Sequence, residues 1–86
     1  MKKIIYMSKP FLVEQTLIVY EDGNKLDMQT IPMEKVNETL FYLMEKYSVN
    51  RVDLVGPKTY CKGLLNQISK LNSSKYNLTN LEINII

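Results

Sequence analysis

The chain has 86 residues, of which 45% are hydrophobic, with 11 lysines and arginines against 9 aspartates and glutamates. The formal net charge of +2 is too small to indicate nucleic-acid binding by itself. There is no histidine and a single cysteine, Cys61, which excludes an intrachain disulfide and every site that depends on imidazole. No apolar run approaches the roughly 18 residues of a membrane span. We therefore expect one small domain over residues 1–86, located in the cytoplasm and without membrane contacts.

The first third of the chain predicts three strands. Residues 3–7, KIIYM, and residues 16–20, TLIVY, are rich in β-branched and aromatic side chains. Residues 25–31, KLDMQTI, alternate apolar and polar side chains, as a half-buried strand does. Between the second and third runs, Asp22-Gly23 favours a tight turn, because glycine tolerates the positive φ that such turns require. We expect these two strands to form an antiparallel hairpin.

After Pro32 the spacing of apolar residues becomes helical. The first apolar stripe consists of Met33, Val36, Leu40, Leu43, Met44 and Tyr47. A short buried strand, RVDLV at residues 51–55, is ended by Gly56-Pro57. A second helical stripe follows, made of Cys61, Leu64, Leu65, Ile68 and Leu71.

Three further features complete the prediction of elements. Gly63 lies inside the second helix, where glycine costs about 1 kcal/mol relative to alanine, so we expect close packing there. The polar run NSSKYN, residues 72–77, predicts the end of this helix. Residues 81–86, LEINII, alternate apolar and polar side chains and predict a last strand.

The resulting order, βββαβαβ, predicts a single small α/β domain with a mixed sheet and two helices. This order resembles a trimmed ribonuclease H-like (actin-like) core. For its nucleases the resemblance implies two metal ions held by acids on the first strand, the first helix and the strand before the second helix. Glu34 or Glu38 and Asp53 could occupy the later places, but KIIYM contains no acid. We expect no enzymatic activity, metal or cofactor, and Asp53 paired with Arg51 or exposed to water; a degenerate ribonuclease H-like enzyme is the alternative.

The stretch VDLVGPKTYCKG, residues 52–63, enters a helix through a glycine, as phosphate-binding loops do. It lacks the G-x-x-x-x-G-K-[ST] spacing of a P-loop. A helix N-terminus with nearby lysines could still bind a phosphate or a nucleic acid weakly. The candidate anion- or nucleic-acid-binding residues are Gly56, Lys58, Lys62 and Lys70. The alternative that we favour is a plain strand-to-helix turn beside a solvated helix face, with Cys61 as a core residue.

The segment SKPFLVEQT, residues 8–16, places three apolar residues together where a polar connection is expected: Phe11, Leu12 and Val13. We expect most of them to be buried in an extended strand. If they are exposed, they form a contact surface for a partner protein. The runs TLIVY and LEINII contain one charge between them and no proline, so an exposed strand edge is a second candidate for self-association.

The segments SKPFLVEQT, VDLVGPKTY and LEINII, in a chain rich in lysine, asparagine and isoleucine, resemble small uncharacterised proteins of phages and prophages from low-GC Gram-positive bacteria. The resemblance implies a protein that binds and inhibits a host or defence protein in the bacterial cytoplasm, as anti-CRISPR proteins do. We therefore expect a non-enzymatic protein-interaction module that forms a homodimer. A weak nucleic-acid- or nucleotide-binding protein is the alternative.

Overall fold

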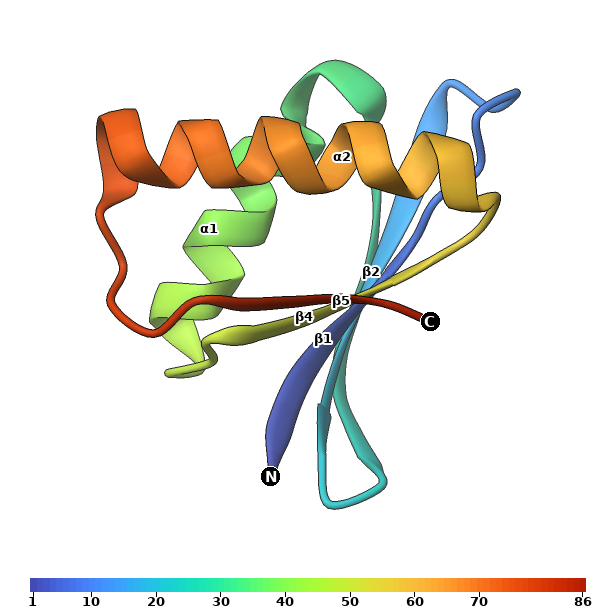
Figure 1. Ribbon diagram of the computed structural model, residues 1–86. Coiled ribbons are helices and arrows are strands. Elements are labelled where there is room, and N and C mark those ends of the chain that lie inside the picture. Colours follow the sequence, from blue (N-terminus) through green and yellow to red (C-terminus); the bar gives the residue numbers. More distant parts are fainter.

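The computed structural model describes residues 1–86 and contains one five-stranded mixed sheet (Figure 1). Its strands are β1 (Lys2–Met7), β2 (Glu14–Glu21), β3 (Asn24–Pro32), β4 (Arg51–Val55) and β5 (Glu82–Ile85). Their order across the sheet is β3-β2-β1-β4-β5. β2 pairs antiparallel with β1 and β3, whereas β4 pairs parallel with β1 and β5. The predicted element order and the mixed sheet are confirmed.

The predicted hairpin joins β2 to β3 through Asp22 and Gly23, with φ of 52° and 82°. Two successive positive φ values match the tight turns that suit the twist of paired strands. Because β1 takes the other side of β2, the run TLIVY lies inside the sheet. The expectation that TLIVY offers an open edge is therefore wrong, and the edges are β3 and β5.

The helical elements are η1 (Met33–Lys35), α1 (Val36–Lys46), α2 (Lys58–Leu71) and η2 (Asn72–Tyr76). The polar run NSSKYN does not end the helix at once, because Asn72–Tyr76 continues it as a π-helical turn. The chain leaves this turn at Asn77, whose φ is 53°. The Asn72 side chain then fixes the exit: it accepts the Leu78 N–H at 2.8 Å and donates to the Leu78 carbonyl at 3.1 Å.

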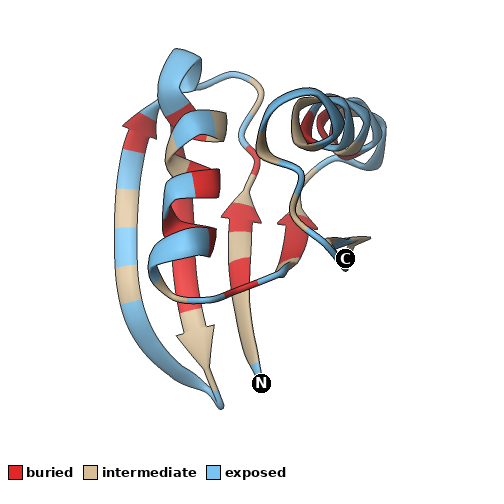
Figure 2. Ribbon diagram, turned by 90° about the vertical axis from the view of Figure 1, so that its left-hand side faces the viewer, coloured by how far each residue is buried: buried red, intermediate tan, exposed pale blue.

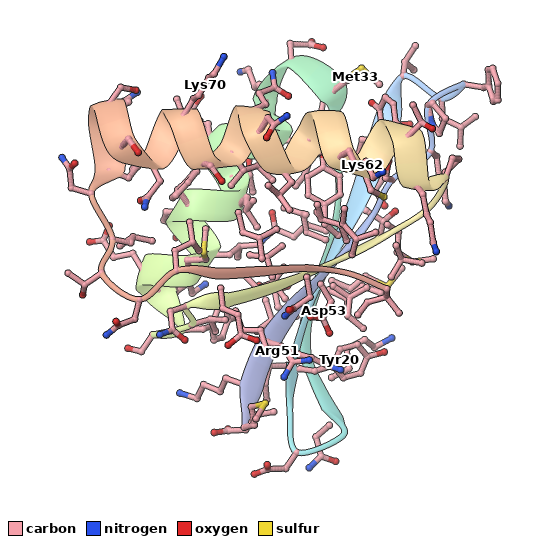
Figure 3. The ribbon with its side chains drawn as sticks, viewed as in Figure 1. Tyr20, Met33, Arg51, Asp53, Lys62 and Lys70 are labelled. Carbon is pink, nitrogen blue, oxygen red and sulfur yellow. The ribbon has the colours of Figure 1, made fainter.

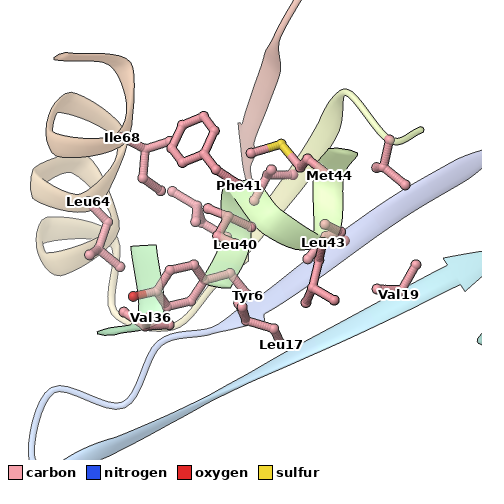
Figure 4. Close-up of a cluster of buried hydrophobic side chains, with 14 of the residues drawn as sticks. Tyr6, Leu17, Val19, Val36, Leu40, Phe41, Leu43, Met44, Leu64 and Ile68 are labelled. Atoms are coloured by element: carbon pink, nitrogen blue, oxygen red, sulfur yellow. The ribbon is translucent and has the colours of Figure 1, made fainter. Parts of the chain in front are cut away.

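Both helices pack on one face of the sheet (Figures 1 and 2). Alternation along the strands puts their buried apolar side chains on this face, and α1 and α2 add theirs to the same cluster (Figure 4). Phe41 of α1 stacks on Tyr76 of η2, with ring centroids 4.1 Å apart. No helix covers the opposite face, whose central residues are Ile5, Ile18 and Met28.

The expectation of close packing at Gly63 is wrong. A β-carbon added at Gly63 would meet nothing within 4 Å, so the glycine does not serve close packing inside the domain. Gly63 is exposed on the outer side of α2, facing away from the core.

Candidate protein-interaction site

The loop between β1 and β2 contains three consecutive apolar residues with exposed side chains. Phe11, Leu12 and Val13 are 97%, 52% and 80% exposed, so the expectation that most of them are buried is wrong. The segment forms a turn at Pro10 and Phe11 and a bend at Val13 before β2 begins at Glu14. Met33 extends the patch, because its N–H donates to the Val13 carbonyl at 2.8 Å.

A fully buried amide holds this loop in place. The Gln15 side chain accepts the Lys9 N–H at 2.7 Å and donates to the carbonyls of Lys9 and Leu12 at 2.8 and 3.2 Å. The Leu12 N–H also closes a turn on the Lys9 carbonyl at 3.0 Å. Pro10 stands at the second position of this turn, where its fixed φ is favourable. Phe11 is therefore exposed on a hydrogen-bonded loop rather than on an unsupported one.

Sequence reasoning missed Gln15, although a signal for it exists. In β2 the inward positions alternate, and Gln15 shares its side of the strand with Leu17 and Val19, which are buried. A glutamine at an inward position must find hydrogen-bond partners, and the nearest unpaired backbone groups belong to the preceding loop. The position of Gln15 in the strand thus predicts hydrogen bonds from its side chain to the loop. This prediction requires knowing that the strand begins at Glu14.

The loop and the start of α2 form a shallow groove. The two segments lie at the same end of the molecule (Figure 1) and enclose a volume of about 520 Å³. No charged side chain lines the groove; the lining residues are Pro10, Phe11, Pro57, Thr59, Tyr60, Gly63, Leu64 and Gln67. Because Gly63 lacks a side chain, the wall formed by α2 is open at that point. The groove extends the apolar surface of Phe11 toward the helix.

The candidate anion site at the start of α2 has a structural explanation. Gly56 has a φ of 150°, and a β-carbon there would approach the Ser8 carbonyl oxygen to 2.6 Å. Glycine is therefore required for the close contact between the ends of β1 and β4, where the Ser8 N–H donates to the Val55 carbonyl at 2.7 Å. The Cys61 N–H closes the first turn of α2 on the Pro57 carbonyl at 2.9 Å. Gly56 is explained without a bound anion.

The three candidate lysines are exposed but do not converge. Lys62 and Lys70 project from α2 in different directions (Figure 3). Since successive helical residues turn by about 100°, Lys58, Lys62 and Lys70 spread over about 120° of the helix surface. They form a solvated basic face rather than one pocket. Between residues 54 and 81, however, the chain has four lysines and no acid.

Cys61 is fully buried and belongs to the core cluster, as expected. Burial raises the pKa of its thiol above the ordinary value of 9.0, although Ser8 partly opposes the shift. A thiol with a raised pKa is a poor nucleophile at neutral pH. Cys61 is therefore a structural residue.

Asp53 is the most buried carboxylate, with 2% of its surface exposed, although it points to the face that no helix covers. Arg51 of the same strand donates to it at 3.1 Å (Figure 3). The Lys3 ammonium lies 3.3 Å away. Asn84 of β5 also donates to it, at 3.3 Å. Burial by itself raises the pKa of Asp53, but these three partners outweigh it and the net pKa is lowered. The expected pairing with Arg51 is confirmed.

The same cluster bears on the degenerate-enzyme alternative. Lys3 of β1 supplies a positive charge beside Asp53, where the nuclease arrangement requires an acid and a metal ion. No group of three or more potential metal-ligating side chains occurs in the structure.

No helix has the length and apolar character needed to cross a bilayer.

Comparison with known proteins identifies the fold. No family model and no curated protein matches the chain. Among solved structures it is similar to a Bacteroides thetaiotaomicron protein with an actin-like ATPase fold and unknown function, with a TM-score of 0.70 and 17% identity. The match covers 99% of this chain and 32% of that chain. It confirms the ribonuclease H-like (actin-like) topology and, at this identity, shows the fold alone.

Proposed function

We propose that this domain is a non-enzymatic protein-interaction module whose partner binds the apolar patch of the β1–β2 loop, and that the module forms a homodimer. The observation that carries the proposal is the combination of a 97% exposed Phe11 with a buried Gln15 that fixes the loop beneath it. A loop whose backbone is already fixed by hydrogen bonds loses little conformational entropy on binding, which favours recognition. The groove beside α2 supplies a concave continuation of the same surface.

The sequence resemblance to phage and prophage proteins defines the partner class that we propose, a host or defence protein of a Gram-positive bacterium. Inhibition in an anti-CRISPR-like manner requires only occlusion of the partner's surface. The neutralised Asp53 cluster supports a role that involves binding without hydrolysis, because Lys3 and Arg51 already compensate its charge. Neither occlusion of a partner's surface nor binding without hydrolysis requires a cofactor.

The test is photocrosslinking from residue 11 in a nuclease-treated host lysate, compared with the same crosslinker at Tyr42. Tyr42 is 58% exposed on α1 and serves as the matched control site. We expect a protein captured from residue 11 and absent at residue 42. Purified partner should then bind wild type but lose at least tenfold in affinity with Phe11→Asp, whereas Tyr42→Asp should bind unchanged. Equal capture from both sites would contradict the proposal.

A second variant tests the hydrogen bonds of the loop separately from the Phe11 side chain. Gln15→Ala leaves Phe11 in place but removes the three hydrogen bonds that fix the loop, and unsatisfied loop groups cost about 1–3 kcal/mol. We expect weaker binding with Gln15→Ala even though every contacting side chain remains. Full affinity in this variant would show that the fixed loop is irrelevant.

A second candidate function is weak nucleic-acid binding, which the run of four lysines without an acid between residues 54 and 81 favours. Such binding is electrostatic and should fall steeply with salt concentration. Fluorescence anisotropy with labelled single-stranded DNA and RNA at two salt concentrations tests it. Binding that falls steeply with salt and is abolished by Lys62→Ala and Lys70→Ala would favour this function over the protein-interaction module.

A further inference from the structure

β3 and β5 are the edge strands, and each leaves one row of backbone groups without a neighbouring strand. Such a row can pair with a strand of another chain unless something blocks it. The two rows differ in what blocks them. That difference indicates which edge takes part in self-association.

Two of the three outward donor positions in the C-terminal half of β3 are blocked. The Met33 N–H bonds to the Val13 carbonyl, and alternation along an antiparallel pair then directs the groups of Met28, Thr30 and Pro32 outward. The Met28 N–H is occupied, because the Asp27 carboxylate accepts it at 2.8 Å. Pro32 has no N–H to offer. Thr30 is the one free donor of these three positions.

The outer row of β5 is open. The Glu82 N–H donates to the Asn50 carbonyl at 2.8 Å and the Ile86 N–H to the Leu54 carbonyl at 3.0 Å. Alternate residues of a parallel strand bond to the same neighbour, so the N–H and C=O groups of Ile83 and Ile85 point away from β4. No side chain accepts a hydrogen bond from either amide, and β5 contains neither proline nor bulge.

The surroundings of β5 leave room for a neighbour. A hollow of about 270 Å³ lies between α2 and the edge, lined by Leu65, Ser69, Asn72, Ser73, Leu81 and Ile83. Ile86, just beyond the strand, is 64% exposed. The single charge of β5 is balanced inside the chain, since Glu82 lies 4.0 Å from Arg51 and accepts the Asn84 amide at 2.9 Å. Glu82 therefore has partners within its own chain.

We infer that β5 pairs antiparallel with β5 of a second copy across a two-fold axis, which joins two sheets of five strands into one of ten. With the axis at Asn84, antiparallel pairing puts Ile83 opposite the partner's Ile85 and Ile85 opposite the partner's Ile83, so both outward rows are satisfied. Glu82 then lies opposite the partner's Ile86, and the two Glu82 side chains do not face each other. The strand is thus complementary to itself in apolar pattern and in charge. The inference rests on the self-association in the proposed function and not on its partner-binding loop.

The test compares proline at the two edges. Ile85→Pro removes an outward N–H of β5 but no bond to β4, and Thr30→Pro does the same for β3 with respect to β2. Size exclusion with light scattering should give twice the 10.1 kDa chain mass for wild type and Thr30→Pro. It should give the monomer mass for Ile85→Pro. A dimer that persists in Ile85→Pro overturns the inference.

Amide hydrogen exchange on the wild type keeps the inference testable if Ile85→Pro fails to fold. Exchange at Ile83 and Ile85 should slow as protein concentration rises, whereas exchange at Thr30 should not change. Rapid exchange at Ile83 and Ile85 in a dimeric sample overturns the β5 interface alone. A wild type that stays monomeric removes both this interface and the proposed homodimer, but leaves the crosslinking result at residue 11 as an independent test of the loop.

Discussion

β3 and β5 belong to one sheet and face the same problem, an outer row of backbone groups, yet the longer strand is the protected one. β3 has nine residues and combines a proline, a bulge and a carboxylate bound to its own backbone. β5 has four residues, and its short length is its main protection. A long edge requires active blocking, whereas a short edge can stay open and pair with a single partner strand.

The difference also shows where edge protection resides. Both strands carry few charges, so composition alone does not separate them. What separates them is the position of Asp27, one residue before an outward N–H that its side chain can reach at 2.8 Å. Part of the protection of β3 is therefore a local hydrogen bond, and one substitution can remove that part.

The largest expected effect comes from opening the protected edge with Asp27→Ala. This change frees the outward N–H of Met28 and leaves Pro32 as the remaining block, while the Tyr47 hydroxyl loses its acceptor at 3.0 Å. With both edges open, we expect species larger than dimers whose mass grows with protein concentration in light scattering. Asp27→Asn is the matched control, because its amide oxygen can still accept the Met28 N–H. Identical mass distributions for Asp27→Ala and wild type would show that Asp27 does not protect the edge.

A smaller effect is expected from acid, because Asp27 in β3 and Asp53 in β4 both lose hydrogen bonds when they are protonated. Burial raises the pKa of Asp27, but hydrogen bonds from Tyr47, Gln29 and the Met28 N–H outweigh it, so the net pKa lies below the ordinary 3.8. The pKa of Asp53 is likewise lowered. A group with a lowered pKa stabilises the fold fully above its ordinary pKa, and this stability is lost as pH falls through the lowered value.

We therefore expect the free energy of unfolding, measured with urea, to fall as pH drops below 3.8. Asp53→Asn should flatten this acid dependence more than Asp27→Asn, because Asp53 is more deeply buried and has two cationic partners. An equal slope in wild type and Asp53→Asn would mean that the Asp53 cluster contributes no pH-dependent stability.

The smallest effect is expected at Gly63, which lies away from both edges. Here the substitution should stabilise the fold rather than weaken it. Alanine fits there without contact, because a β-carbon meets nothing within 4 Å. Gly63→Ala should raise the free energy of unfolding by about 0.5–1 kcal/mol through helix propensity and leave the oligomer mass unchanged. Thermal and urea denaturation measure the first, light scattering the second. A destabilised variant would indicate a contact at Gly63 that the isolated chain does not show.

Periodicity predicted the elements of this fold because each element has a simple local cause. The two helical stripes, the Asp22-Gly23 turn and the alternating strands all follow from side-chain spacing and φ preference. The run TLIVY was misplaced at an edge because spacing gives the faces of a strand but not its neighbours. Strand order depends on which crossovers pack, a property of the whole chain.

The candidate site was predicted only in part, for a related reason. The apolar run Phe11–Val13 is visible in the sequence, but its exposure depends on a turn at Lys9 and on the side chain of Gln15. Gly56 is visible in the sequence, but its close approach to Ser8 is not. Long-range contacts decide both cases, and a single sequence carries no direct record of them.

The hydrogen bond from the Met28 N–H to Asp27 has a consequence that polymer chemistry describes well. A monomer with one reactive end can only pair, whereas a monomer with two reactive ends grows into a chain of unlimited length. In the proposed β5 dimer, the Asp27 carboxylate and Pro32 leave each domain with one reactive edge. Assembly of the proposed dimer then stops at two chains, and the blocked edge of β3 acts as the chain terminator.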